Sequence, residues 1–142
     1  MASLGSCVED CSCYVGLAIV EDEKELVNIL VKLFEKYGIS VCFIAYDGRE
    51  ALSHFMRCHP RPQMVLMDYR LPSMNGIEVT KEILNIEPQT KVIFLSADDS
   101  IRQEAMNSGA TAFLRKPASL KEISEEIKQV VKKFPDIKVF TS

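Results

Sequence analysis

The sequence predicts an α/β fold, namely a doubly wound parallel sheet of five strands with helices on both faces. Two observations lead to this prediction. Five short apolar runs alternate with five segments in which apolar side chains recur at helical spacing. The runs are apolar at successive positions, as in strands that a parallel sheet buries on both faces. The length of 142 residues suits one such domain and is too short for two.

The first strand and helix illustrate the pattern. Residues 16–20 form an apolar run that stops abruptly at three acidic residues. Apolar side chains then recur at helical spacing from Leu26 to Tyr37, and Gly38 supplies a C-terminal stop. The acidic residues at the front of this helix also favour its dipole. Residues 16–38 therefore predict one strand followed by one helix.

The same alternation repeats four more times. Asp47-Gly48 opens the second helix, Glu87-Pro88 follows the third, Asp98 or Asp99 can cap the fourth, and Ser119 caps the fifth. The remaining predicted strands cover residues 39–45, 64–67, 91–95 and 110–114, and the remaining helices cover residues 47–57, 76–86, 98–107 and 119–131. For this alternation we expect the flavodoxin-like strand order 2-1-3-4-5.

Composition and chain ends limit the possible functions. We expect residues 1–15 to be a disordered extension, residues 16–133 to form the domain and residues 134–142 to be a short tail. The formal net charge of −3 argues against direct binding to nucleic acid. No apolar run approaches the roughly 20 residues of a membrane helix, and the first residues do not resemble a signal peptide. We therefore expect a cytoplasmic protein without a membrane partner.

The cysteines and histidines offer a second, weaker signal. Cys7, Cys11 and Cys13 crowd the N-terminus, which fits either a metal or redox cluster or a set of free thiols. We favour free thiols because no second cysteine or histidine pair completes a metal site. His54 falls in a helical segment and His59 in a proline-rich turn, with nothing nearby in sequence to activate either ring.

Polar side chains stand at the carboxyl ends of four predicted strands. Glu21 and Asp22 follow the first strand, Asp68 ends the third, Ser96 follows the fourth and Lys116 follows the fifth. Open α/β sheets place their ligand sites at this edge, and neighbouring strands lie about 4.8 Å apart, so these groups should converge. Two carboxylates about 4 Å apart repel by roughly 4 kcal/mol at an effective dielectric near 20. A hard cation that prefers oxygen ligands, Mg2+ above all, would relieve this repulsion.

Such a site is equipped for phosphoryl transfer. Asp68 would attack phosphorus in line, the metal and Lys116 would hold the phosphoryl oxygens, and Ser96 would donate a hydrogen bond. Each residue alone has a simpler explanation, since an acidic pair can cap a helix and Asp68 can begin a turn. The prediction therefore depends on all of these residues occurring together at the correct strand ends.

At this point the sequence resembles the response-regulator receiver family of two-component signalling and chemotaxis. The resemblance covers about residues 17–132. It is carried by Ile19-Val20-Glu21-Asp22-Glu23, by Met67-Asp68-Tyr69-Arg70-Leu71-Pro72-Ser73-Met74-Asn75-Gly76, by Phe94-Leu95-Ser96-Ala97, and by Gly109-Ala110 running to Leu114-Arg115-Lys116-Pro117.

The resemblance implies a role for each site residue. Asp68 would accept a phosphoryl group from a sensor histidine kinase or a phosphotransfer protein. Glu21, Asp22, Asp68 and the backbone carbonyl of Arg70 would bind Mg2+. Ser96 would bind a phosphoryl oxygen, and Lys116 would pair with Asp68 and then with its phosphate. The family often has a cis peptide bond after this lysine, so the bond from Lys116 to Pro117 is a candidate.

The resemblance also implies a switch. A phosphoryl group adds about −1.5 to −2 charges, so Ser96 and its loop would move toward it and Phe113 would fill the vacated space. The surface of the fourth helix, fifth strand and fifth helix, about residues 98–132, would then bind a downstream protein or a second copy, giving a monomer or a phosphorylation-dependent dimer. Glu21, Ser96 and Phe113 stand where the family often has Asp, Thr and Tyr, which preserves the charge and the hydroxyl donor but loses a phenol.

Three rival interpretations remain from the residues. A phosphatase of the haloacid-dehalogenase type would need a second Asp two residues after the nucleophile, where this chain has Arg70. A flavin domain would need a phosphate-binding loop after the first strand, where the acidic residues would repel it. A receiver that only docks to partners would not need its complete set of site residues. We therefore expect a self-phosphorylating switch with slow autodephosphorylation rather than a turnover enzyme, and we expect Arg70 to pair with Asp98 across the site.

Overall fold

The computed structural model describes residues 16–139, which form one five-stranded parallel sheet. The strand order is β2-β1-β3-β4-β5, and every neighbouring pair is parallel. The strands are β1 (Leu17–Val20), β2 (Val41–Ala45), β3 (Met64–Met67), β4 (Lys91–Ser96) and β5 (Ala112–Arg115). The helices are α1 (Lys24–Lys36), α2 (Gly48–Arg57), α3 (Gly76–Ile86), α4 (Arg102–Asn107) and α5 (Leu120–Lys133), with a short 3-10 turn, η1 (Asp99–Ile101), before α4.

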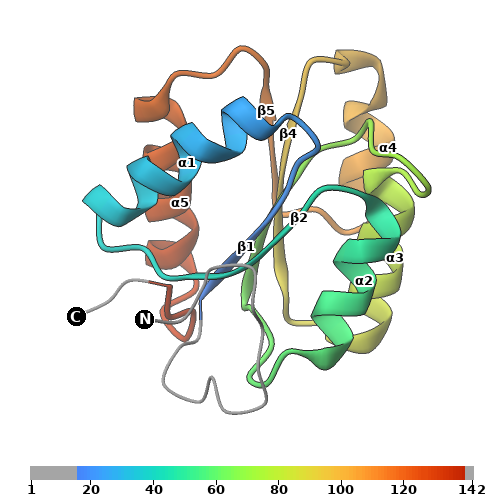
Figure 1. Ribbon diagram of the computed structural model, residues 1–142, viewed down its shortest axis with the longest axis horizontal. Coiled ribbons are helices and arrows are strands. Elements are labelled where there is room, and N and C mark those ends of the chain that lie inside the picture. Colours follow the sequence, from blue (N-terminus) through green and yellow to red (C-terminus); the bar gives the residue numbers. More distant parts are fainter. Residues whose placement is uncertain (1–15, 140–142) are drawn as a thin grey trace.

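The helices cover both faces of the sheet. Figure 1 shows α1 and α5 on one face and α2, α3 and α4 on the other. Leu17 and Ile19 of β1 belong to the buried cluster on the first face, whereas Ala18 and Val20 belong to the cluster on the second. This alternation explains why β1 is apolar at every position. The predicted fold class and strand order are confirmed.

Two predicted strand starts are two residues too early because the preceding helix ends hold those residues, and one predicted helix begins as a 3-10 turn. The amide of Ile39 bonds the carbonyl of Phe34 at the end of α1, so β2 begins at Val41. The amide of Ala110 bonds the carbonyl of Ala105, so β5 begins at Ala112 instead. The predicted fourth helix starts as η1, capped by Asp98, before α4 begins.

The residues after α5 pack against the amino-terminal edge of the sheet. Ile137 and Val139 are buried in the same cluster as α1 and α5. The amide of Ser40 donates to the carbonyl of Val139 at 2.7 Å, and the amide of Lys138 donates to Gln63 Oε1 at 2.6 Å. The segment from 134 to 139 therefore closes this edge and contributes to the core.

Other predictions concern the chain ends and membranes. The expected extension over residues 1–15, with its cysteine cluster, lies outside the described residues, so the choice between free thiols and a metal cluster stays a prediction. Cys58 is buried in the cluster under α2. Among the described residues, the structure has no helix that is both long and apolar enough to span a membrane.

Candidate functional site

The carboxyl edge of the sheet brings the predicted acidic residues together. Glu21 directly follows β1 and Asp68 directly follows β3, and the Asp68 amide donates to the carbonyl of Val20 at 2.9 Å. Carboxylate oxygens of Glu21, Asp22 and Asp68 all lie within 4.8 Å of one another. Glu21 and Asp68 are buried, whereas Asp22 is exposed. The pairing of β1 with β3 therefore creates an acidic pocket that opens to solvent on one side.

The backbone around Asp68 is tightly packed. The amide of Tyr69 donates to Asp68 Oδ1 at 2.8 Å, which fixes one carboxylate oxygen. At Gly76, the first residue of α3, a Cβ atom would overlap the carbonyl oxygen of Asp68. Any larger residue at Gly76 would therefore push α3 away from the strand end that carries Asp68.

Lys116 is the cation of this pocket. It follows β5, and its amide donates to the carbonyl of Ser96 at 2.8 Å. Its Nζ lies 3.0 Å from Glu21 Oε1, 3.5 Å from Asp68 Oδ1 and 3.8 Å from Glu23 Oε1. The Lys116–Pro117 peptide bond is cis, as the resemblance implied. One ammonium group thus forms ion pairs with three carboxylates.

Burial and crowding perturb the ionisation of the pocket. Burial, with the charge of Asp68 as a second cause, raises the pKa of Glu21 to about 7, although Lys116 opposes the shift. Burial also raises the pKa of Asp68, again against the pull of Lys116. For Lys116, burial lowers the pKa, but the carboxylates of Asp68 and Glu21 outweigh it, and the net shift is upward. The pocket therefore holds more acidic groups than its lysine can neutralise.

The donor set fits a hard divalent cation. Three carboxylates supply only oxygen ligands, and one side of the cluster is exposed and leaves room for water. Mg2+ is bound in proteins by one or two carboxylates plus waters, and a soft metal would need thiolate or imidazole ligands. The described residues offer no other group of three such ligands. The carbonyl of Arg70, the fourth predicted ligand, stays a prediction.

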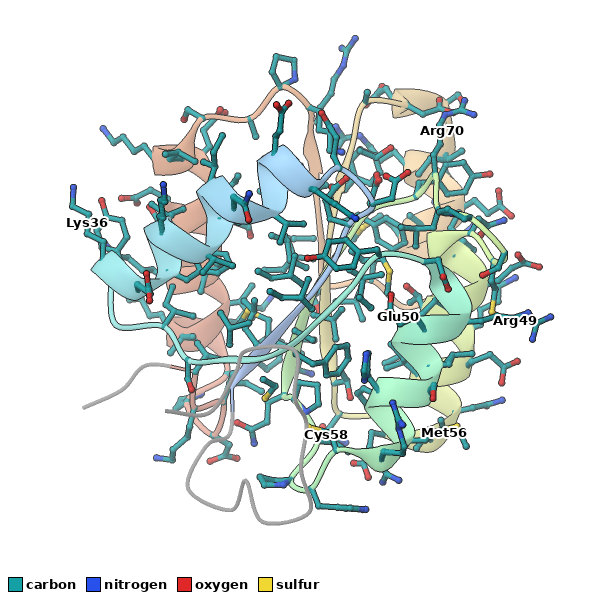
Figure 2. The ribbon with its side chains drawn as sticks, in the orientation of Figure 1. Lys36, Arg49, Glu50, Met56, Cys58 and Arg70 are labelled. Atoms are coloured by element: carbon teal, nitrogen blue, oxygen red, sulfur yellow. The ribbon has the colours of Figure 1, made fainter. Side chains whose placement is uncertain are left out.

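Ser96 connects the pocket to the loop after β4. Ser96 is buried at the end of that strand, and its Oγ accepts a hydrogen bond from the amide of Asp98 at 3.1 Å. Asp98 in turn forms an ion pair with Arg70, with Nη2 and Oδ2 3.1 Å apart. The expected pairing of Arg70 and Asp98 is therefore present. Figure 2 places Arg70 at the edge opposite Cys58.

Phe113 lies on β5 and is buried, and we call this buried placement of the ring the inward position. The residue is 9% exposed, and its ring stacks on Phe94 with centroids 6.2 Å apart and planes 12° apart. The guanidinium carbon of Arg102 lies 4.5 Å from the centroid of the same ring. Sequence reasoning did not predict this contact, because nothing in the spacing of Arg102 and Phe113 shows that α4 and β5 bring them together.

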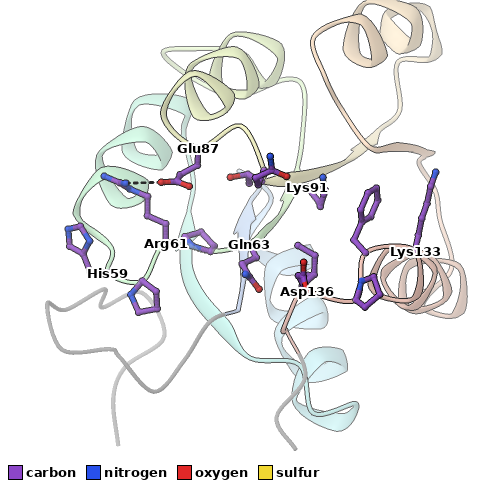
Figure 3. Close-up of a pocket in the computed structure, with 14 residues that line it drawn as sticks. His59, Arg61, Gln63, Glu87, Lys91, Lys133 and Asp136 are labelled. Carbon is purple, nitrogen blue, oxygen red and sulfur yellow. Dashed lines mark hydrogen bonds and ion pairs between the residues drawn. The ribbon is translucent and has the colours of Figure 1, made fainter.

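The two histidines lie away from this pocket. On α2, His54 Nε2 is 3.5 Å from Glu50 Oε2, and the His54 ring packs at a tilt of 36° against Phe43, with centroids 5.3 Å apart. His59 lines a cavity of about 730 Å³ at the amino-terminal edge of the sheet, shown in Figure 3 with the ion pair of Arg61 and Glu87. None of the predicted site residues lines that cavity.

Comparison with known proteins identifies the family of the chain that carries this acidic pocket. The family described as the response regulator receiver domain matches residues 17–128, which is most of the chain. The chain belongs to this receiver family. The resemblance inferred from the sequence is thus confirmed, and neither the phosphatase nor the flavin interpretation is supported.

Several individual receivers are similar to this one. The chain is 34% identical over 116 residues to the chemotaxis protein CheY of Thermotoga maritima, covering 80% of this chain and 95% of the relative. It is 32% identical over 115 residues to sporulation initiation phosphotransferase F of Bacillus subtilis, covering 80% and 90%. It superposes with a TM-score of 0.76, at 26% identity, on a chain of the CheX–CheY–BeF3–Mg2+ complex of Borrelia burgdorferi, covering 80% and 87%.

Other curated relatives are longer than this chain, which spans 23% to 51% of their length. Similarity to those proteins therefore concerns one part of each. Receiver domains are in general signalling domains of two-component systems rather than turnover enzymes, and they bind Mg2+ in an acidic pocket. The cluster of Glu21, Asp22 and Asp68 is compatible with Mg2+ and with aspartyl phosphorylation.

Proposed function

We propose that this receiver is a phosphorylation-activated switch or phosphorelay intermediate that accepts a phosphoryl group on Asp68. The observation that carries the proposal is the cluster of three carboxylates within 4.8 Å, in which Lys116 Nζ reaches both Glu21 and Asp68. The phosphoryl donor would be a phosphohistidine on a sensor kinase or on a phosphotransfer protein. The name of the Bacillus subtilis relative, a phosphotransferase, supports a role in a relay.

The residues of the pocket divide the chemistry among them. A carboxylate oxygen of Asp68 attacks phosphorus, the bond from phosphorus to the donor nitrogen breaks, and the electron pair returns to the imidazole ring. Glu21 and Asp22, with the Asp68 carboxylate and the carbonyl of Arg70, would hold Mg2+. When bound, Mg2+ neutralises the charge that develops on the phosphoryl oxygens.

Lys116 and Ser96 would act on the other side of the phosphoryl group. Lys116 lies 3.5 Å from Asp68 Oδ1 and would follow the negative charge as it moves to the phosphoryl oxygens. Ser96 would exchange its hydrogen bond with the Asp98 amide for a bond to a phosphoryl oxygen. That exchange would displace the loop that leads into α4. The pocket would also catalyse slow loss of its own phosphoryl group, without turnover of other substrates.

The output surface would be the face formed by α4, β5 and α5. Motion of the Ser96 loop would alter the contacts of Phe113 and the position of α4 on this face. A downstream protein, or a second copy of the chain, would read that change, so we propose a monomer or a phosphorylation-dependent dimer. The Borrelia burgdorferi relative was solved together with a partner, CheX, which supports a docking role. We propose a cytoplasmic location without direct binding to nucleic acid or membranes.

The test is phosphorylation with a small-molecule donor. We expect the protein to gain one phosphoryl mass when it is incubated with acetyl phosphate and Mg2+ and measured by intact mass spectrometry. Asp68→Asn should gain none, because it lacks the nucleophile, and removal of Mg2+ by a chelator should prevent the gain in the wild type. Asp136→Asn, at an exposed residue far from the pocket, is the matched control and should behave like the wild type.

Two results would overturn the proposal. One is an equal mass gain in Asp68→Asn, which would place the modification elsewhere. The other is no gain in the wild type at any Mg2+ concentration, which would leave the chain as a receiver that only docks to partners.

A further inference from the structure

Arg102 makes two contacts that the phosphorylation mechanism does not use. Its Nε and Nη2 both donate to Asp99 Oδ1, at 3.1 and 3.0 Å. The same guanidinium lies 4.5 Å from the centroid of the Phe113 ring, within the range of a cation–π interaction. Asp99 opens η1 and Arg102 opens α4, so one side chain joins the loop after β4 to the aromatic residue of β5.

Phe113 is contacted from the sheet as well as from α4. Its ring stacks on Phe94, which is fully buried in β4 two residues before Ser96. The inward ring position is therefore supported by the packing of β4 and by the cation from α4. Because Phe94 is fixed in the core and Arg102 is half-exposed at the surface, Arg102 is the contact that can change.

A short series of contacts connects Arg102 to Ser96 at the edge of the acidic pocket. The buried hydroxyl of Ser96 holds the amide of Asp98, and the Asp98 carboxylate caps η1 by accepting from the amide of Ser100. Asp99, the next residue after Asp98, holds the guanidinium of Arg102. A displacement of the Ser96 loop would thus act directly on the group that covers Phe113.

We propose that Arg102 is a clamp that holds the Phe113 ring inward, and that Asp99 fixes the orientation of the clamp. The ring-holding part stands on the contacts of Arg102 alone. The consequence for phosphorylation rests on the proposed function, because a contact that stabilises the inward ring favours phosphorylation only if the two are coupled. Arg102 is in this sense a positioning residue for the switch.

The size of the effect follows from the exposure of the contact. A cation–π interaction at an exposed site shifts an equilibrium between two ring positions by about two- to fivefold. Loss of Arg102 should therefore raise the population of the outward ring by about that factor. If phosphorylation requires the inward ring, its rate should fall by up to the same factor, because a smaller fraction of the molecules is competent.

The ring equilibrium is measured by fluorine NMR on protein labelled with fluorophenylalanine. The chain has seven phenylalanines, and loss of one signal in Phe113→Leu assigns the resonance. Relaxation dispersion of that resonance reports exchange between ring positions, whereas removal of a nearby charge without ring motion only changes its shift. We expect larger dispersion in Arg102→Ala than in the wild type, and an intermediate result in Arg102→Lys, which keeps the charge but not the forked contact to Asp99.

Two further variants sharpen the assignment. Asp99→Asn should increase the dispersion less than Arg102→Ala does, and should add nothing in the double variant, because Asp99 is proposed to act only through Arg102. Arg49→Ala removes the same charge from the exposed surface of α2 and should match the wild type. In parallel, the rate of phosphorylation by acetyl phosphate should fall in Arg102→Ala, by at most about two- to fivefold.

The possible outcomes separate the clamp from the proposed function. Equal dispersion of the Phe113 signal in Arg102→Ala and the wild type would overturn the clamp, whatever the phosphorylation rates. Increased dispersion with an unchanged phosphorylation rate would overturn the coupling of the clamp to the site. No phosphorylation of the wild type would overturn the proposed function. Relaxation dispersion of the Phe113 signal would then still test whether Arg102 holds the ring inward.

Discussion

The two edges of the sheet differ in how their polar groups are paired. At the carboxyl edge, Glu21 and Asp68 are buried beside each other and share Lys116 with Glu23. At the amino-terminal edge, the polar groups are paired individually. The amide of Ser40 meets the carbonyl of Val139, and the amide of Lys138 meets Gln63 Oε1.

This difference indicates that the carboxyl edge of the domain is built for function and the amino-terminal edge for stability. Burying two carboxylates together disfavours the folded state, and such an arrangement persists where it is useful for binding or chemistry. The residues from 134 to 139 instead bury Ile137 and Val139 against the opposite end of the same strands. The comparison predicts that changes at the amino-terminal edge affect stability alone, and that changes at the carboxyl edge affect the response to pH, Mg2+ and phosphoryl donors.

The largest expected effect is at the amino-terminal edge. Ile137→Ala should lower the free energy of unfolding by roughly 2–4 kcal/mol, because it removes buried methyl groups and leaves a cavity. Urea denaturation followed by circular dichroism measures the change. Lys138→Ala is the control, since the backbone rather than the exposed side chain of Lys138 holds Gln63.

The same variant also tests the separation of the two edges. At a temperature where Ile137→Ala is folded, its rate of phosphorylation by acetyl phosphate should equal that of the wild type. Surface substitutions usually change the unfolding free energy by less than about 0.5 kcal/mol. A loss that small in Ile137→Ala would show that the terminal segment is not part of the core.

The terminal segment also shows where sequence reasoning stopped. The sequence predicts only a short tail from Phe134 to Ser142, too short to be an output domain. Ile137 and Val139 are buried next to hydrogen bonds with Ser40 and Gln63, which lie far away in the sequence. Isolated hydrogen bonds of this kind leave no periodic signal. In contrast, β1 and β3 were predictable, because burial on both faces makes every position apolar.

The acidic pocket was largely predictable from topology. Once Glu21, Asp68 and Lys116 are assigned to strand ends, the order of a parallel sheet places these three side chains together. The length and direction of side chains were not predictable in this way. Lys116 lies closer to Glu21 than to Asp68, and Arg102 covers Phe113 from another element. Contacts between different elements depend on packing, which the spacing of residues within one element does not encode.

A smaller effect should appear in the pH dependence of the metal-free protein. The pKa of Glu21 is raised from its ordinary value of 4.5 to about 7 in the folded protein. Between these two pH values the folded state therefore binds more protons than the unfolded state. This contribution to stability is fully present below about pH 4.5 and is lost as the pH rises through about 7. The unfolding free energy should therefore fall by on the order of 1–3 kcal/mol across this window.

Mg2+ and a Glu21 variant provide the comparison for this prediction. Urea denaturation at a series of pH values should show a decline without metal, and saturating Mg2+ at pH 8 should restore the lost stability by binding the ionised cluster. Glu21→Gln should flatten the decline, because it cannot ionise. A Glu21→Gln profile that superposes on the wild type would assign the pH dependence to other groups and contradict the description of a crowded acidic pocket.

The smallest expected effect concerns the ion pair between Arg70 and Asp98. Arg70 is 77% exposed, so Arg70→Ala should change the unfolding free energy by less than about 1 kcal/mol. The pair joins the loop after β3 to the loop after β4. We expect it to restrict the approach of water to a phosphoryl group on Asp68. We expect the phosphoryl group to be lost about two- to fivefold faster in Arg70→Ala, which corresponds to loss of one exposed ion pair. The decay of the phosphorylated mass after removal of acetyl phosphate measures this rate.

Arg49→Ala, on α2, is the control because it removes the same charge. If the phosphoryl group decays as slowly in Arg70→Ala as in Arg49→Ala, the ion pair does not shield the site.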